Sequence, residues 1–331
     1  MARYVAERVM LGAQPLVVLR DDAGRRVRIA CHGAALLNFE VPRGGEMFDV
    51  ASGYRDEAGI EQRPGSHFAI LAPFAGRIGN ARYRFEDHEH DLQPGAQGDA
   101  RGIMHGFVRD SDFTVAELSA AESAAHTTLT TSAIRPRPGY PFSIDLAVTF
   151  TLDAGGLGLE ARMRNVGDAV APCFFGWHAY LRMGGGIVDD WLLQIQASTL
   201  IRTDTNLIAL PGKAAYVPLD DAPAFDFRQS RRIANAILDV GYTDLDTGPD
   251  GRIRTRLTDP SDGFGVAVWQ ERGVMHAFTA DTLKHGARRA IALEPMECMA
   301  DAFNRPECTA AIRLEPGAER KFRCGIEVTS T

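Results

Sequence analysis

Alternation of apolar and polar residues with a period of two is the feature that most restricts the fold of this chain. Residues 27–31, 144–150, 157–163, 253–257 and 322–328 carry apolar side chains at every second position, with few interruptions. Successive side chains of a strand point to opposite sides of a sheet, so this period gives one buried face and one polar face. These segments are predicted to be β-strands.

Turn signals separate the predicted strands. The chain contains 33 glycines and 17 prolines, which favour short elements and tight turns over long helices. The turns recur about every ten residues, a spacing typical of antiparallel sandwiches, and the main ones are Asp22–Gly24, Pro42–Gly45, Asp153–Gly156, Asn165–Gly167, Pro249–Gly251 and Pro260–Gly263. The predicted fold class is therefore all-β, a large antiparallel β-sandwich.

Nothing in the sequence divides the chain into separate units. We find no linker, internal repeat or abrupt shift in composition, so residues 1–331 are predicted to form a single domain. Residues 111–126 are rich in alanine but show no clear helical stripe of apolar residues. The sequence does not decide whether that segment forms a helix, and no long helix is expected elsewhere.

Charge and cysteine usage restrict the partners and the compartment. Lys and Arg total 36 and Asp and Glu total 43, for a net charge of -7, which argues against nucleic-acid or membrane partners. The apolar stretch 67–76 is too short to span a bilayer, and residues 1–11 do not resemble a secretory signal. Five cysteines without a Cys-x-x-Cys pair indicate reduced thiols, so we expect a cytoplasmic protein.

Common cofactor and nucleophile motifs are missing. The sequence has no phosphate-binding Gly-x-x-x-x-Gly-Lys loop, no Gly-x-Gly-x-x-Gly after a strand and no Gly-x-Ser-x-Gly elbow. His88 and His90 share one side of a predicted strand and resemble a metal-binding pair. Their neighbours Asp87 and Gln93 to Gly95 favour an exposed hairpin instead, so no metal and no cofactor is predicted.

Four segments place a polar residue among glycines, aromatic residues and aliphatic residues, which is unusual for surface loops. They are residues 72–80, 104–107, 174–180 and 293–296. Each has an ordinary structural explanation, such as a buried histidine bonded to the backbone. Together they supply the guanidinium of Arg77, the imidazoles of His105 and His178 and the carboxylate of Glu294, a set suited to proton transfer on a polar neutral ligand.

These segments, in this order, resemble the aldose 1-epimerase (galactose mutarotase) family over nearly the whole chain. The matching motifs are Arg77-Ile-Gly-Asn80, His105-Gly106, Trp177-His178-Ala-Tyr180, Asp226-Phe-Arg228 leading to Leu238-Asp239, and Glu294-Pro-Met296 with Asp301-Ala-Phe-Asn304. The resemblance implies the galactose mutarotase-like supersandwich, in agreement with the strand pattern. It also implies interconversion of the α and β anomers of a free monosaccharide, without a cofactor.

The resemblance assigns the proton transfers that open and reclose the sugar ring. Glu294 is expected to be the base for the hydroxyl on the anomeric carbon, and His178 the acid, with His105 assisting near the ring oxygen. A carboxyl group in a partly apolar pocket has a raised pKa, while a neighbouring imidazole is expected to stay protonated. These three residues are the predicted catalytic set.

Substrate binding is expected from five further positions. Arg77, Asp239 and Asn80 are predicted to bind sugar hydroxyls through paired donors and acceptors. Trp177 and Phe107 are predicted to stack on the apolar face of the sugar. Without the resemblance, Asp239 is equally explained as a turn residue, and for Asn80 a turn role is the default expectation. The partner is therefore a small monosaccharide, and the sequence does not predict the oligomeric state.

Three alternatives to a free-sugar mutarotase stay open. Residues 105–109 are closer to the hexose-6-phosphate mutarotase branch, and Arg109 would contact a phosphate, although Asp110 makes a surface ion pair the simpler expectation. A glycosidase would pair Glu294 with Asp239 or Glu297, although Glu297 is expected outside the proton-transfer pair. A non-catalytic sugar-binding protein would keep the pocket without turnover.

Overall fold

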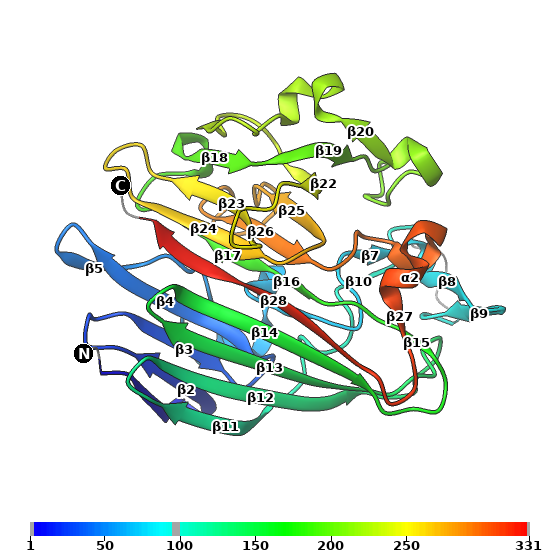
Figure 1. Cartoon of the computed structure of the whole chain (residues 1–331), viewed down its shortest axis with the longest axis horizontal. Helices are drawn as coiled ribbons and strands as arrows, with labels where there is room; N and C mark the ends of the chain where they lie inside the picture. Colours follow the sequence, from blue (N-terminus) through cyan, green and yellow to red (C-terminus); the bar gives the residue numbers. More distant parts are fainter. Residues whose placement is uncertain (1–2, 95–99, 330–331) are drawn as a thin grey trace.

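The computed structural model describes residues 3–94 and 100–329 and consists mainly of antiparallel strands (Figure 1). The largest sheet has nine strands in the spatial order β11 (Thr114–Ala120), β12 (Ala124–Ile134), β13 (Ile144–Asp153), β14 (Gly156–Asn165), β28 (Glu319–Thr329), β24 (Gly265–Gln270), β23 (Ile253–Thr258), β18 (Leu192–Ile195) and β21 (Arg231–Arg232). Figure 1 shows β28, in red, crossing the middle of this sheet. The chain's last described strand therefore joins its two halves.

A second sheet of eight strands carries the residues of interest for function. Its order is β20 (Tyr216–Pro218), β19 (Ala197–Ile201), β22 (Asp239–Leu245), β25 (Val274–Phe278), β26 (Ile291–Met296), β16 (Gly176–Trp177) and β6 (Ile70–Leu71), with β17 (Ala179–Leu181) also paired to β26. The middle strands of this sheet are rich in buried residues. The sheet thus offers a rigid surface on which side chains can be placed accurately.

In the described residues the remaining elements are a five-stranded sheet, three short ribbons, two short α-helices and eight 3₁₀ helices of three or four residues. The five strands are β1 (Val5–Leu11), β2 (Gln14–Arg20), β3 (Arg26–Ala30), β4 (Ala35–Arg43) and β5 (Glu46–Asp49). The ribbons are β7 (Arg77–Ile78) with β10 (Ile103–Met104), β8 (Arg82–Phe85) with β9 (His88–Asp91), and β15 (Ala171–Pro172) with β27 (Arg313–Leu314). The helices are α1 (Glu57–Gln62) and α2 (Thr309–Ile312). Among the described residues no helix is long and apolar enough to cross a membrane.

The predicted all-β sandwich is confirmed, and each segment with period-two alternation lies in a strand. The alanine-rich residues 111–126 contain no helix and instead form most of β11 and the beginning of β12. Ala125, Thr127 and Leu129 of β12 are fully buried at alternate positions, which explains why no helical stripe was present. All five cysteines lie in the described residues and none forms a disulfide.

Aromatic side chains join the two large sheets. The ring of Phe150 in β13 lies edge-on to Trp177 in β16, with 6.4 Å between ring centroids. The ring of Phe175 is tilted by 45° against that of Phe322 in β28, with 5.9 Å between centroids. These residues belong to one continuous cluster of buried side chains that also includes the five-stranded sheet. The single-domain organisation stays a prediction, and this shared core is consistent with it.

Replacement of Phe150 by alanine tests the contact between the sheets. We expect the free energy of unfolding to fall by about 3 to 5 kcal/mol, because a fully buried ring is replaced by a cavity. Thr151→Ala, at the next position and on the other side of β13, is the control and should cost less than about 1 kcal/mol. Urea denaturation measures both, and equal losses would contradict the proposed packing.

Candidate active site

One side of the eight-stranded sheet forms the floor of a cavity of about 320 Å³. His276 of β25 lies directly opposite Glu294 of β26 on one side and Gly241 of β22 on the other. Val274 lies opposite Met296 in the same ladder. All five residues line the cavity. The period of two therefore places alternate residues of adjacent strands on one surface.

The carboxyl group of Glu294 and the imidazole of His178 lie together at this cavity. His178 Nε2 is 3.3 Å from Glu294 Oε1, and the two residues are only 5% and 3% exposed. The backbone holds His178 on both sides, because its N–H donates to Ala69 O and its carbonyl accepts from Phe68 N–H. The ring of His178 stacks on Tyr180 with 4.8 Å between centroids. This pair is rigid and shielded from water.

His105 reaches the same cavity from a turn beside the β7–β10 ribbon. Its ring lies 5.2 Å from that of His178, at an angle of 77°. His105 has a φ of 66° and Gly106 a φ of 68°, a left-handed conformation that only glycine adopts freely. The N–H of His105 donates to Gly76 O at 2.9 Å. The structure thus brings together the three predicted catalytic residues.

Burial controls the protonation of the central pair. Removal from water raises the pKa of Glu294 to about 7, although the charge of His276 opposes the rise. Burial, followed by the imidazoles of His105, His67 and His276, holds the pKa of His178 well below its ordinary value. The expectation that His178 stays protonated in the free protein is therefore wrong, because the expectation ignored the complete burial of the ring.

Sequence reasoning missed His276, whose positive charge favours the ionised forms of Asp239 and Glu294 in the cavity. Its Nε2 lies 2.9 Å from Oδ1 of Asp239. Burial alone lowers the pKa of His276, but the hydrogen bond to Asp239 and the charges of Glu294 and Asp239 outweigh it and raise the pKa. The alternation of Val274, His276 and Phe278, all of which line the cavity, was a signal that would have placed this histidine on the sheet surface.

The predicted substrate-binding residues divide into two groups. Arg77 and Asp239 line the cavity. Trp177 is fully buried and packs against Phe68 and Phe150 in the core. The prediction that Trp177 stacks on a sugar is therefore not supported by its position.

Phe107 and Asn80 also lie outside the set of residues that line the cavity in the described parts of the chain. The ring of Phe107 packs against Phe74 and Tyr140, and the guanidinium of Arg137 covers it at 4.1 Å. Asn80 is exposed in a turn with a φ of 54°, which is the ordinary role of an asparagine in a turn. Neither residue has the place that the sequence predicted for it.

Arg109 and Glu297 have structural partners. Arg109 donates to Asp110 at 3.2 Å and to Ser66 at 3.0 Å, so the simpler prediction of an ion pair with Asp110 is confirmed. Glu297 accepts from Phe175 N–H at 2.8 Å and pairs with Arg272. Neither side chain lines the cavity in the described residues.

His88 and His90 lie in the β8–β9 hairpin, as predicted from their neighbours, and His90 stacks on Tyr83 with 4.6 Å between ring centroids. The described residues contain no group of three or more His, Cys, Asp and Glu side chains that would hold a metal ion. The hairpin prediction for this segment is confirmed.

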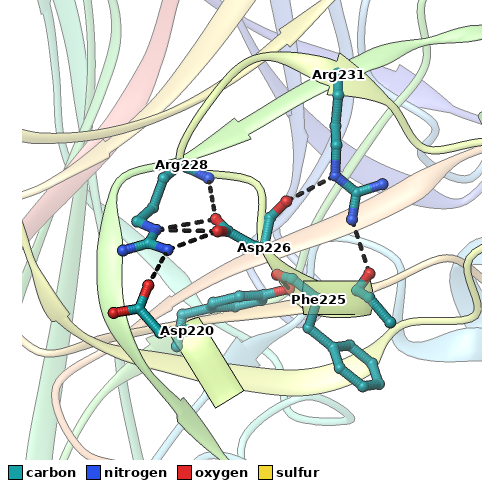
Figure 2. Close-up of polar contacts among 7 residues, drawn as sticks. Asp220, Phe225, Asp226, Arg228 and Arg231 are labelled. Carbon is teal, nitrogen blue, oxygen red and sulfur yellow. Dashed lines mark hydrogen bonds and ion pairs between the residues drawn. The ribbon is translucent and has the colours of Figure 1, made fainter. Parts of the chain in front are cut away.

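The loop before β22 supports the strand that carries Asp239. Figure 2 shows Asp226 bound by Arg228, whose NH2 lies 2.7 Å from Oδ2, while the Nε of Arg231 donates to the carbonyl of Asp226 at 2.6 Å. Tyr242 of β22 donates to the carbonyl of the residue before Asp226 at 3.0 Å. The motif around Asp226 therefore has a structural role behind the cavity.

Comparison with known families agrees with the observed fold. The family model described as aldose 1-epimerase matches residues 15–327. The chain therefore belongs to the aldose 1-epimerase family. Members of this family act on sugars, which supports a small sugar as the class of ligand.

Individual relatives are distant. The YihR protein of Escherichia coli is 29% identical over 246 residues, covering 74% of each chain. Human galactose mutarotase is 26% identical over 316 residues, which cover 89% of this chain and 88% of the human protein. At this distance the relatives agree with the family match and leave the substrate open.

Solved structures support the same fold. A galactose mutarotase-like protein from Clostridium acetobutylicum superposes with a TM-score of 0.83, 11% identity and coverage of 99% of both chains. Galactose 1-epimerase from Lactobacillus acidophilus gives a TM-score of 0.78 with 18% identity, covering 99% of this chain and 98% of that chain. The galactose mutarotase-like fold implied by the sequence motifs is confirmed.

Replacement of Glu294 by glutamine tests the buried carboxyl without any substrate. The pKa of Glu294 is raised from 4.5 to about 7, so between these pH values the folded chain keeps a proton that the unfolded chain loses. Wild-type stability therefore falls as pH rises through this window. We expect Glu294→Gln to gain about 3 kcal/mol relative to wild type between about pH 4 and pH 8, measured by urea denaturation.

Glu160→Gln is the control for that measurement. Burial raises the pKa of Glu160, but the hydrogen bonds and charges of Arg323 and Lys321 together outweigh it, so the pKa is lowered overall. The contribution of Glu160 to stability is present above its unfolded pKa and is lost as pH falls. The stability difference of Glu160→Gln should therefore change in the opposite direction, and a pH-independent Glu294→Gln difference would contradict the burial argument.

Gly106→Ala tests how the turn holds His105. A Cβ at Gly106 would lie 2.0 Å from the carbonyl oxygen of Ala72, whereas a Cβ at Gly44, also at positive φ, meets nothing within 4 Å. Both alanines cost about 1 to 2 kcal/mol for the left-handed backbone. We expect Gly106→Ala to lose at least about 1 kcal/mol more than Gly44→Ala in thermal unfolding, and equal losses would show that the turn can move.

Proposed function

We propose that this protein is an aldose 1-epimerase that interconverts the α and β anomers of a free monosaccharide by acid and base catalysis. The family supports an isomerase acting on sugars. The observation that carries the proposal is the buried pair of Glu294 and His178, with 3.3 Å between carboxyl oxygen and imidazole nitrogen. A pair of this kind supplies both a proton acceptor and a proton donor in one protected place.

The reaction needs one proton to leave the sugar and one to arrive. The hydroxyl on the anomeric carbon gives its proton to Glu294, while the ring oxygen takes a proton from His178. The bond between the anomeric carbon and the ring oxygen breaks and an open aldehyde forms. After rotation about the neighbouring carbon–carbon bond, the two protons return and the ring recloses on the other face. Atoms and charges balance without a cofactor.

The pKa directions of the pair explain how it serves both roles. In the free protein the proton rests on Glu294, because burial raises the pKa of Glu294 to about 7 and lowers that of His178. Ring opening requires the other arrangement, with an ionised Glu294 and a protonated His178. The contact between the two groups allows a single proton to pass from one to the other. Ring opening leaves Glu294 protonated and His178 neutral, and reclosure of the ring restores the ionised Glu294 and the protonated His178.

Other cavity residues are suited to hold the sugar hydroxyls. Arg77, Asp239 and Tyr180 line the cavity and present a guanidinium, a carboxylate and a phenol. Such groups discriminate strongly between substrates, because a missing hydroxyl leaves a buried polar group without a partner. These three residues are the proposed binding set, with His105 beside the ring oxygen.

The direct test is the rate of anomer exchange on freshly dissolved aldoses, followed by polarimetry or NMR. We expect wild type to accelerate exchange for one or a few sugars and Glu294→Gln to lose about 10² to 10⁴-fold in kcat. Glu160→Gln, which removes a surface carboxylate paired to Arg323 at 2.7 Å, should retain the wild-type rate.

Other results of that experiment identify the alternatives. Acceleration confined to phosphorylated aldoses would replace the free-sugar substrate with a hexose phosphate. Release of nitrophenol from nitrophenyl glycosides would indicate a glycosidase. Sugar binding without accelerated exchange would indicate a binding protein, and full activity in Glu294→Gln would remove Glu294 from the mechanism.

A further inference from the structure

His276 stands between the two carboxylates of the cavity. On one side it lies opposite Glu294 in the β25–β26 ladder, and directly opposite residues of antiparallel strands have Cβ atoms about 5 Å apart. On the other side its Nε2 contacts Asp239 at 2.9 Å. The side chain is 22% exposed and lines the cavity. An imidazole placed in this way faces both negative groups at short range.

Asp239 fixes the charge and the orientation of this imidazole. Burial raises the pKa of Asp239, but the hydrogen bond to His276 and the charges of His276, Arg77 and His105 together outweigh it and lower the pKa, so the carboxylate is ionised at neutral pH. The same bond favours the protonated form of His276. Because Nε2 is held by Asp239, the ring cannot turn away from Glu294 without losing a charge-assisted hydrogen bond.

Several other groups face Glu294. They are His178 and Tyr180 from the β16–β17 segment, Asp239 from β22, Arg77 from β7 and His105 from the turn after β10. His178 is neutral in the free protein, and the charge of Asp239 raises the pKa of Glu294 further, after burial. His276 is the neighbour whose charge acts in the opposite direction.

We propose that His276, held by Asp239, is a positioning residue that keeps Glu294 able to ionise at neutral pH by placing a cation opposite it. The role in catalysis rests on the proposed function of Glu294 as the base. The electrostatic role stands without it. Loss of the cation would leave a buried carboxyl group that stays protonated at the pH where the reaction must run.

The test compares His276→Gln with wild type in two titrations. The first follows the side-chain carboxyl carbon of Glu294 by ¹³C NMR, with the signal assigned by its loss in Glu294→Gln. The second follows kcat/KM for anomer exchange against pH. We expect the midpoint of Glu294 and the acidic limb of the rate profile both to move upward by about one pH unit in His276→Gln. Unchanged midpoints would overturn the proposal.

Two further variants separate charge from structure. His276→Lys keeps a cation and should restore a midpoint below that of His276→Gln, whereas a purely structural role would not be rescued. His126→Gln removes a histidine that contacts Glu117 at the same 2.9 Å in the β11–β12 hairpin, and it should leave both titrations unchanged. If His276→Gln fails to fold, His276→Asn takes its place as the neutral variant.

The NMR titration needs no turnover, so the two proposals fail in different ways. A shifted Glu294 midpoint without any accelerated anomer exchange would leave the electrostatic role intact and overturn the proposed function. Accelerated exchange with an unshifted midpoint would support the proposed function and overturn the role of His276.

Discussion

The burial of one carboxyl group at the floor of an apolar sheet is the constraint on which the site depends. Removing Glu294 from water is unfavourable for the charged form. Two imidazoles lie next to the carboxyl group. His178 contacts the carboxyl group directly, and His276 supplies a charge from the adjacent strand. The result is a proton acceptor whose pKa of about 7 matches the pH at which most enzymes work.

The register of the strands positions these groups more precisely than a loop would. Gly241, His276 and Glu294 form a row across three adjacent strands, and a shift of any strand by one residue would turn its side chains into the core. Gly241 suits this row because a Cβ there would lie only 3.1 Å from the side chain of Ile201 on the neighbouring strand. Only His105 depends on a turn, and that turn is held by glycine and by a backbone hydrogen bond.

The sequence predicted the strands well, because burial of one face of a sheet places an apolar residue at every second position of each strand. The proposed catalytic residues, which the structure brings to one cavity, followed from their motifs, whereas His276 was missed because a single histidine in an apolar segment has no distinctive neighbours. Trp177 illustrates the opposite error. It precedes His178 in an extended segment, so the two side chains point to opposite sides, and Trp177 must face the core. Protonation states depend on burial from several elements, which no local pattern reveals.

The same alternation separates the residues that shape the cavity from the residues that pack the core on each strand. In β25 and β26, Val274, Phe278 and Met296 face the cavity. Ala277 and Leu293, which lie opposite each other in the two strands, are fully buried in the core. Side chains that shape the cavity can therefore change in evolution without disturbing the packing that holds the sheets together. One scaffold can in this way acquire a differently shaped cavity while the proposed proton-transfer residues stay in place.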